Sequence, residues 1–419
     1  MKKSFLTQTF FLCLTFIYFQ GNAQCPDGRF YDKIFDLKSS FPSEITYGQN
    51  VDYQGSSQNL RMRVFEPDND PAVSRPLIIL AHGGSFLTGA KESPDILTLC
   101  SEFAQRGYVT ATISYRLGAE EVDSSNMMAA VIRGVHDARA AVRYFYKDAR
   151  TINEFRIDTN QIFMGGVSAG AFIGLHLGYM TDTSIIDGFI MDVINDLGGI
   201  EGNSGNEGYS SNIKGVINLC GAIGDTSWIK ADGPICVSMH GTEDGTVPYG
   251  TDMIRVSGND ILVVDGSHSI QQKFNELGIA SEFYTFNGAD HVPFVNPLPP
   301  PLSDGPLYMD TTIKFIRDFL VVHTDCPEVL SNITENKRFP EISIYPNPVN
   351  SILNIEGSSD APYTLLLHDL MGRVVFSEEN ISLSYHLDVS EFKPGYYLLS
   401  LKNKENSQFS IKERVFITH

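Results

Sequence analysis

Short apolar runs alternate with segments of helical periodicity between residues 77 and 323. The runs are continuous and rich in β-branched residues, which is typical of strands buried on both faces of a parallel sheet. In residues 127–147 apolar side chains recur at spacings of three and four, so one face of that helix is expected to pack on a sheet. We predict a mostly parallel sheet with helices on both faces, an α/β fold. The predicted strands are 77–81, 109–114, 162–164, 216–219, 235–239 and 283–286, and the predicted helices are 96–105, 127–147, 170–179, 270–277 and 311–321.

Two regions depart from this pattern. Residues 60–65 alternate apolar and polar positions, which predicts an antiparallel strand at the edge of the sheet. After residue 326 the chain first turns polar and then carries short apolar runs separated by turn residues such as Asn347-Pro348. We therefore predict an α/β domain over 24–326, a linker over 327–340 and a small all-β sandwich over 341–419.

The first 23 residues are organised as a secretory signal peptide. Lys2 and Lys3 precede an apolar stretch over 5–19, and Gly21-Asn22-Ala23 supplies small residues for cleavage. The apolar stretch is too short for a membrane span, and the sequence shows no later one of about 18 residues. We expect an exported chain without a transmembrane segment.

Charge narrows the range of partners. The 419 residues include 31 Lys and Arg against 50 Asp and Glu, a formal net charge of −19. Such a surface repels phosphate backbones, so nucleic acid and anionic membranes are poor partners and a neutral or cationic substrate fits better. Solubility alone also accounts for the charge.

Cysteine usage fits an oxidising compartment. Cys13 lies in the predicted signal peptide, and the five remaining cysteines leave at least one thiol free. Because Cys25 and Cys326 bracket the larger domain, we predict a disulfide between them. Cys100 lies in a helical pattern and is expected to be a buried thiol. No cluster of Cys and His has the spacing of a zinc site, so we expect no metal.

A serine lies between two glycines where a predicted strand gives way to a predicted helix, in Gly166-Val167-Ser168-Ala169-Gly170. Glycine on both sides allows a turn so tight that the serine hydroxyl stands above the sheet edge, as in a nucleophile elbow. The pattern alone is weak, because small residues are common at strand-to-helix turns. Ser168 is therefore a candidate nucleophile that needs partners.

A second glycine-rich segment, His82-Gly83-Gly84-Ser85-Phe86, follows the predicted strand 77–81. Glycines there allow backbone N–H groups to face a ligand, which stabilisation of an oxyanion requires. We assign an oxyanion hole to the amides of Gly84, Ser85 and Ala169. A plain glycine-rich turn is the alternative.

An acid and a base follow the next predicted strands. Asp244 lies in the loop after strand 235–239, and His291 lies in the loop after strand 283–286. In open α/β sheets catalytic residues gather at the carboxyl ends of strands, and triads of this fold follow the order serine, acid, histidine. We predict that Ser168, Asp244 and His291 meet as nucleophile, orienting acid and base.

Neighbouring acids and the other histidines are alternatives for these roles. Glu243 adjoins Asp244, and Asp290 adjoins His291 and is expected to cap a loop. The other histidines are expected to be structural: His82 shapes its loop, His240 ends a strand beneath the acid loop, His268 begins a helix, and His136 and His176 lie inside helices.

With these motifs, residues 40–323 resemble secreted α/β-hydrolases of the carboxylesterase type, nearest to the H-G-G group that includes acetyl-xylan and feruloyl esterases. The matching stretches are 82–86, 106–117, the elbow, and the acid and histidine loops. The resemblance implies cleavage of carboxylic esters through an acyl-enzyme, without a metal or organic cofactor. Ser85 stands where many relatives have a third glycine.

Residues 341–419 closely resemble the C-terminal sorting domain of proteins exported by the type IX secretion system. The matching stretches are 345–349, 370–375, 387–390 and 394–398. The resemblance implies that the tail is read by an outer-membrane export machine and that the protein is secreted or surface-bound. A carbohydrate-binding or adhesive module is the alternative.

Substrate choice is the least determined property. We expect a lid over 181–212, with a helical first half and a mobile second half over 198–208. Candidate substrates are acetyl or feruloyl esters of plant polysaccharides, or polyesters. A serine peptidase on the same fold and an inactive binding or adhesion protein are the alternatives. The candidate substrate-binding residues are Phe86, Trp228, Tyr249 and Phe294.

Overall fold

The computed structural model describes residues 25, 27–39, 44–295, 305–327, 342–357, 361–369, 373–404 and 410–418. The chain forms two compact units that divide between Leu330 and Ser331, inside the predicted linker. The predicted signal peptide lies outside the described residues. Each unit is described here by itself.

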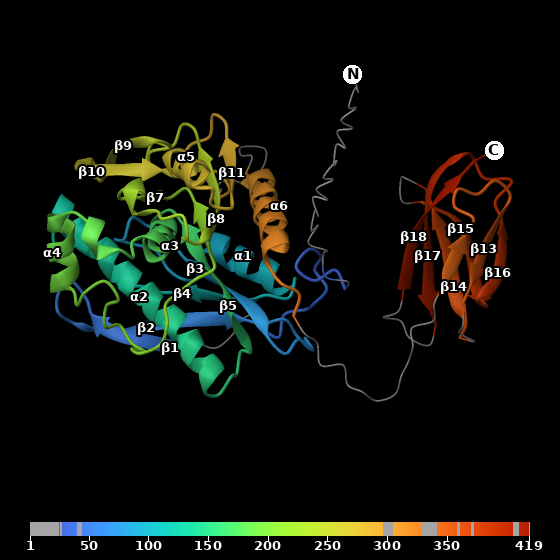
Figure 1. Ribbon diagram of the computed structural model, residues 1–419, viewed down its shortest axis with the longest axis horizontal. Coiled ribbons are helices and arrows are strands. Elements are labelled where there is room, and N and C mark those ends of the chain that lie inside the picture. Colours follow the sequence, from blue (N-terminus) through green and yellow to red (C-terminus); the bar gives the residue numbers. More distant parts are fainter. Residues whose placement is uncertain are drawn as a thin grey trace, which may run out of the picture. The chain divides into compact units, whose positions relative to one another are not determined.

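An eight-stranded sheet forms the centre of the larger unit (Figure 1). In spatial order its strands are β1 (Glu44–Val51), β2 (Ser57–Phe65), β4 (Val109–Ile113), β3 (Arg75–Ala81), β5 (Ile157–Val167), β6 (Gly215–Leu219), β8 (Ile235–Gly241) and β11 (Ser281–Phe286). From β4 to β11 neighbouring strands run parallel, whereas β1 and β2 are antiparallel to their neighbours. The predicted α/β-hydrolase fold is confirmed.

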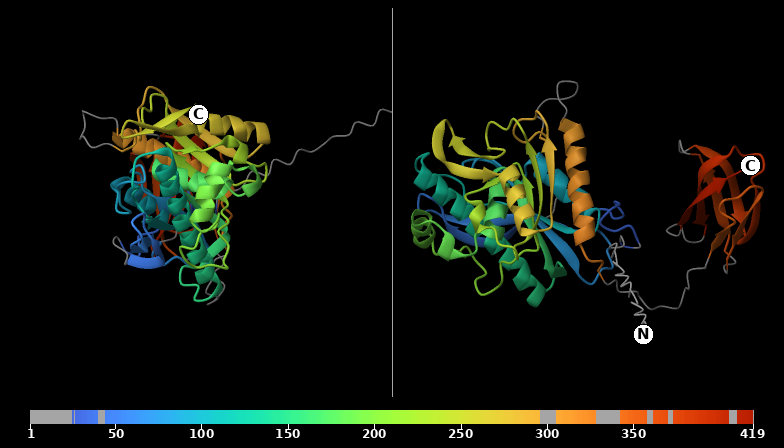
Figure 2. Two further views of the ribbon diagram at one scale, coloured as in Figure 1. Left: turned by 90° about the vertical axis from the view of Figure 1, so that its left-hand side faces the viewer. Right: turned by 45° about the horizontal axis from the view of Figure 1, so that its top comes forward.

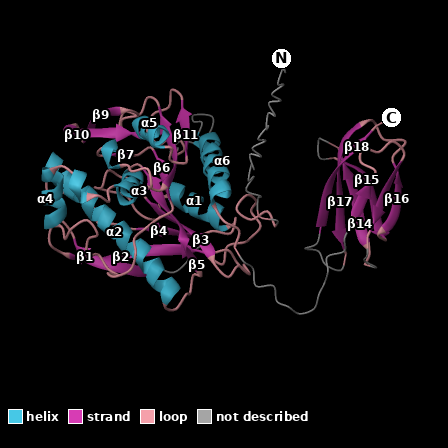
Figure 3. Ribbon diagram, in the orientation of Figure 1, coloured by secondary structure: helices cyan, strands magenta, loops and turns pink. Residues whose placement is uncertain are grey.

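Helices cover both faces of this sheet, as Figure 3 shows. One face carries α2 (Ser124–Arg150), α3 (Ala169–Tyr179) and α5 (Ser267–Leu277), and the other carries α1 (Pro94–Ala104) and α6 (Gly305–His323). Along β3, Leu77 and Ile79 join the core under α2 and α3, and Ile78 and Leu80 join the core under α1. Successive side chains of a strand point to opposite faces of the sheet. Because helices cover both faces, successive positions of the strand must be apolar, which gives the continuous apolar runs seen in the sequence.

Local signals set the helix ends. The Asp123 carboxylate accepts a hydrogen bond from Asn126 N at 2.8 Å and caps the start of α2. Pro94 begins α1, where its missing N–H costs nothing, and Gly278 ends α5 with a left-handed φ of 69°. In the part of the chain that the structure describes, no helix combines the length and apolarity that a membrane crossing needs.

The prediction of an edge strand over 60–65 was wrong in one respect. β2 is antiparallel as expected, but it lies between β1 and β4, and β1 forms the edge. β1 begins with the polar–apolar alternation Glu44-Ile45-Thr46-Tyr47, but a register shift between Thr46 and Gly48 interrupts it. The alternating segment is therefore too short to have shown the strand in the sequence.

A second, three-stranded antiparallel sheet lies beside the main one, and the sequence analysis missed it. It consists of β7 (Ala222–Ile223), β10 (Asn259–Gly266) and β9 (Thr251–Val256), in that order. Ser257 and Gly258 turn the β9–β10 hairpin with φ of 51° and 83°. The hairpin is yellow in Figure 1 and in the right-hand view of Figure 2. It adjoins the N-terminal end of α2, and β10 contacts this helix.

The connection over 181–212 differs from the expected lid in its second half. Its first half contains the short helix α4 (Gly188–Asp196), as predicted. Its second half is anchored, because buried Ser204 hydrogen-bonds Asp137 at 2.7 Å and Arg143 Nη1 donates to Glu201 O at 2.9 Å. These bonds hold residues 198–208 against α2, and the expectation of a mobile segment over the site was wrong.

The smaller unit is a sandwich of two antiparallel sheets with its own apolar core, which includes Leu353, Leu365 and Val415 (Figure 3). One sheet has β12 (Ser343–Tyr345), β13 (Ile352–Glu356) and β16 (Ser384–Asp388), and the other has β15 (Val374–Ile381), β14 (Tyr363–His368), β17 (Gly395–Asn403) and β18 (Ser410–Ile417).

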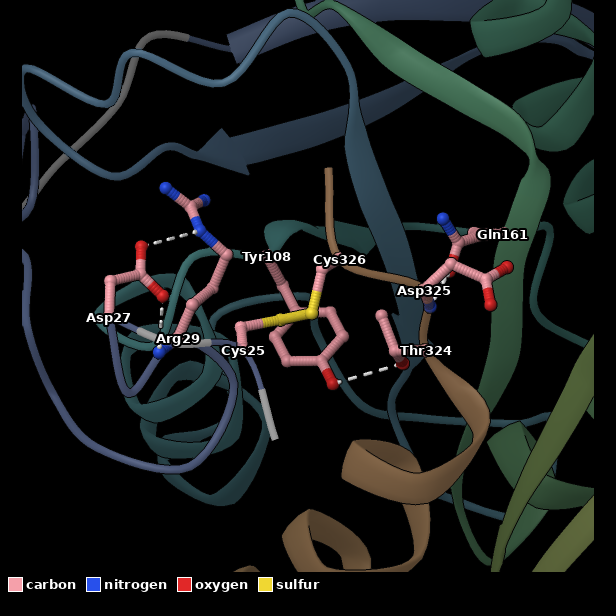
Figure 4. Close-up of a disulfide and its surroundings, with 8 residues drawn as sticks. All are labelled: Cys25, Asp27, Arg29, Tyr108, Gln161, Thr324, Asp325 and Cys326. Carbon is pink, nitrogen blue, oxygen red and sulfur yellow. Dashed lines mark hydrogen bonds and ion pairs between the residues drawn. A yellow bond between two sulfur atoms is a disulfide. The ribbon is translucent and has the colours of Figure 1, made fainter. Parts of the chain in front are cut away.

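A disulfide joins Cys25 to Cys326, as predicted, and closes the larger unit across 301 residues (Figure 4). The following segment is also tied to the core, because Thr324 Oγ1 lies 3.2 Å from Tyr108 Oη and Gln161 Oε1 accepts from Asp325 N at 2.7 Å. The free thiols of Cys100, Cys220 and Cys236 are buried.

Candidate active site

Ser168 lies at the turn from β5 into α3 and has the strained backbone of an elbow, with a φ of 53°. The residues two positions before and after it, Gly166 and Gly170, must be glycines because the backbone of the turn lies directly against β3. A Cβ atom on Gly166 or on Gly170 would lie 2.0 Å from Ala81 O. The two glycines that identified the motif are thus explained by one close approach of backbone to backbone.

The three residues predicted to meet do lie together. His291 Nε2 lies 2.9 Å from Ser168 Oγ, and His291 Nδ1 lies 2.6 Å from Asp244 Oδ2. They come from the loops after β11, β5 and β8, which end at the same edge of the parallel sheet. The order of contacts is nucleophile, imidazole, carboxylate, as a serine acyl-transfer site requires.

The Asp244 carboxylate is fully buried and firmly held. Its Oδ1 accepts from Thr246 N at 2.9 Å and from Val247 N at 2.8 Å. Burial raises the pKa of Asp244, but hydrogen bonds from His240 and His291 outweigh burial and hold the pKa well below its ordinary value. The carboxylate therefore stays ionised and fixes the orientation of His291.

The neighbouring acids do not take this position. Glu243 is exposed beside the acid loop. Asp290 Oδ1 accepts from Gly245 N at 3.0 Å and from His291 N at 2.7 Å, so it ties the acid loop to the histidine loop. This loop-capping contact matches the expectation for Asp290.

His240 contacts the same carboxylate oxygen as His291, a contact that sequence reasoning did not find. Its Nε2 lies 3.1 Å from Asp244 Oδ2, and its Nδ1 lies 2.7 Å from Ser267 Oγ. Asn218 Nδ2 donates to the same Ser267 oxygen at 2.9 Å. All of these side chains are buried, so Asp244 rests on a closed polar network. No sequence signal marks this contact, because His240 ends β8 and Asp244 lies in the loop after it, where a spacing of four does not fix proximity.

The loop after β3 turns sharply beside Ser168. Gly84, Ser85 and Phe86 have positive φ angles of 122°, 54° and 63°. A Cβ on Gly83 would lie 3.4 Å from Ser168 Cβ, which places this backbone next to the elbow. His82 supports the loop as expected, since its Nδ1 lies 2.7 Å from Gly83 O and its ring stacks on Tyr115.

Ser168, Ser85 and Ala169 line one open pocket. Of the four candidate substrate-binding residues, Phe86 and Trp228 line it. Most of its wall is aliphatic or contains methionine, and it comes from α2, α3 and the β9–β10 hairpin.

Tyr249 and Phe294 do not line this pocket. Tyr249 stacks on His268, and its hydroxyl lies 2.9 Å from Thr285 Oγ1. Phe294 is buried in the core under α1 and α6. Both were chosen for their closeness in sequence to the acid and histidine loops, and that closeness does not determine which face of a loop a side chain occupies.

His176 lines the pocket, although we expected only a structural role. Its Nδ1 lies 2.7 Å from Phe172 O, and its Nε2 accepts from Gly224 N at 3.3 Å. Burial lowers the pKa of His176 to about 4 despite its bond to the Phe172 carbonyl, so the ring is neutral at pH 7. Both ring nitrogens are engaged with the protein.

Among the described residues, one group has the ligand types and closeness of a metal site, namely Cys220, Asp244 and His291, whose ligand atoms lie within 4.8 Å of one another. Asp244 and His291 are already hydrogen-bonded to each other. Burial raises the pKa of the Cys220 thiol, which disfavours the thiolate that a metal binds. The donor set suits a proton-transfer pair better than a metal ion.

Comparison with known proteins agrees with this geometry. Residues 62–223 match the BD-FAE family model, and residues 343–417 match that of the secretion system C-terminal sorting domain. The chain is an esterase-like α/β-hydrolase with a secretion-sorting tail. The tail points to type IX secretion and hence to a secreted or cell-surface location.

Individual relatives are more distant. The neuroligin-like protein glit-1 of Caenorhabditis elegans is 33% identical over 122 residues, which are 28% of this chain and only 16% of that protein. The apo form of Thermogutta terrifontis esterase 2 is similar in structure with a TM-score of 0.50 and 20% identity, over 68% of this chain and 97% of that one. Its propionate-bound form has a TM-score of 0.48 and 19% identity, and the match covers 67% of this chain and 93% of that one. At such identities the structural likeness concerns the fold.

Proposed function

We propose that this protein is a secreted serine esterase that cleaves carboxylic esters through a Ser168–His291–Asp244 triad. The observation that carries the proposal is the continuous chain of hydrogen bonds from Ser168 Oγ through His291 to the buried Asp244 carboxylate. The BD-FAE match over 62–223 supports the same reaction class.

In the proposed mechanism, Ser168 Oγ attacks the ester carbonyl while His291 Nε2 takes the hydroxyl proton. Asp244 holds the imidazole tautomer and stabilises the imidazolium. The amides of Ala169, Gly84 and Ser85 stabilise the oxyanion, and removing one such donor costs on the order of a hundred- to a thousandfold in turnover. His291 then protonates the leaving alcohol, and water attacks the acyl-enzyme by the same steps.

The test uses Ser168→Ala and His291→Ala in the full mature chain. Hydrolysis of p-nitrophenyl acetate should fall by at least about a thousandfold in each variant, since the triad acts as a unit. Fluorophosphonate should label the wild type and not Ser168→Ala. Exposed Ser227→Ala and His268→Ala are matched controls that should keep full activity.

A substrate panel separates the alternatives. Acetylated xylan, a feruloyl ester and a peptide amide are compared with the chromogenic esters. Cleavage of the amide in preference to every ester would favour a peptidase, and an unlabelled Ser168 would favour a binding protein. Full activity of Ser168→Ala would refute the triad.

A further inference from the structure

The pocket below Ser168 follows one side of α3. Ala169, Phe172 and His176 line it at spacings of three and four, so they form a single stripe of the helix that starts directly after Ser168, and Met180, the residue after the helix, continues the line. At 1.5 Å per residue, the stripe from Ala169 to Met180 is roughly 16 Å long. The pocket is therefore a channel rather than a shallow cup for an acetyl group.

The opposite wall is apolar along this length. Met127, Met128 and Val131 face the channel from the first turns of α2, and Ile254 and Ile261 face it from the β9–β10 hairpin. Methionine side chains adapt to a flexible chain. Trp228 and Ile190 of α4 also line the channel.

The ester has a defined direction in this site. The leaving alcohol must lie next to His291, which protonates it. His291 does not line the channel, whereas Ser168, Ala169 and Ser85 do. The acyl group therefore occupies the channel, and the alcohol points to the side of His291.

His176 and Arg255 do not favour a hydroxylated acyl group, and Thr246, the other polar side chain of the channel besides the serines, is exposed to solvent. Both ring nitrogens of His176 are engaged, with Phe172 O and Gly224 N. Arg255 is exposed and pairs with Asp260 at 2.6 Å. A phenolic hydroxyl placed deep in the channel would lose its bonds to water and gain little in return.

We propose that the natural substrates are esters of extended aliphatic acyl groups, of about 8 to 12 carbons, that lie along α3. An extended chain advances roughly 1.2 Å per bond, so a channel of roughly 16 Å holds about a dozen bonds. Each methylene that leaves water improves binding by roughly three- to fourfold. The proposal rests on the esterase function above and names the acyl class of the same site.

The test compares kcat/KM for p-nitrophenyl acetate, butyrate, octanoate and decanoate and for a feruloyl ester. We expect decanoate or octanoate to exceed acetate by at least tenfold. Val131→Phe and Ile190→Trp narrow the channel from two different elements and should lower the ratio of decanoate to acetate by at least tenfold. Val263→Phe is the matched control, because Val263 is exposed on β10 and should leave the ratio unchanged.

Acetate or the feruloyl ester as the best substrate would overturn the proposal, and so would unchanged ratios in both channel variants. Failure of the proposed esterase function is distinguishable from failure of the proposed acyl class. If the protein is not an esterase, no ester is cleaved and fluorophosphonate does not label Ser168. Labelling of each variant at the wild-type level shows that it is folded.

Discussion

At the residue scale, the unexpected feature is the second histidine on Asp244, the proposed triad acid. Asp244 Oδ2 lies 2.6 Å from His291 Nδ1 and 3.1 Å from His240 Nε2. A buried carboxylate that loses one of its donors is less well held, and the imidazole it orients is then less well placed. His240 is a positioning residue in this interpretation.

We predict that His240→Ala lowers kcat by roughly ten- to a hundredfold, the range for a hydrogen bond to a charged group, with little change in KM. His240→Asn, which keeps a donor, should recover part of the loss. Steady-state kinetics with a short ester measure both. A full kcat in His240→Ala would show that the network serves folding alone, and exposed His268→Ala provides the control.

At the element scale, the two helices α2 and α3 pack against each other and each buries a histidine. Burial, helped by nearby Arg116, lowers the pKa of His136 to about 4, and burial lowers that of His176 to about 4 as well. The unfolded chain takes up these protons near pH 6.5, whereas the folded chain does so only near pH 4. Between these values the unfolded state binds more protons, so stability falls as the pH falls.

We predict that the free energy of unfolding decreases between pH 6.5 and 4, by up to about 3 kcal/mol for each histidine. Urea unfolding at a series of pH values measures this slope. His176→Phe removes one titrating group and should flatten the slope by about one proton. An unchanged slope in this variant would contradict the assignment of the effect to His176.

At the scale of the whole molecule, the Cys25–Cys326 disulfide joins the two ends of the α/β unit. It restricts the unfolded chain across nearly the full length of the α/β unit, while the proposed active site lies in loops that the disulfide does not touch. The bond is expected to matter for stability and not for chemistry.

We predict that replacing both cysteines by serine lowers the free energy of unfolding by about 2–4 kcal/mol and leaves kcat near the wild-type value at 25 °C. Thermal unfolding with and without a reducing agent checks the first part, and ester hydrolysis checks the second. An equal response to reductant in the wild type and the double variant would show that another thiol is responsible.

Much of the fold followed from local patterns. The continuous runs predicted buried parallel strands because two covered faces leave no polar position on a strand. The sandwich of the smaller unit was marked by its turn residues. β1 and β9 were missed because almost none of their residues are fully buried, so their apolar signal is weak. β10 carries the apolar run Ile261–Val264 and was missed all the same.

The sequence by itself determined that the loops of Ser168, Asp244 and His291 lie together, since these residues follow strands, and parallel strands bring such loops to one edge. Only the tertiary structure decided what surrounds them. The contact of His240 with Asp244, the channel along α3 and the absence of Tyr249 and Phe294 from its wall all depend on side-chain direction. Side-chain direction follows from the packing of elements that are distant in sequence, and no local pattern encodes it.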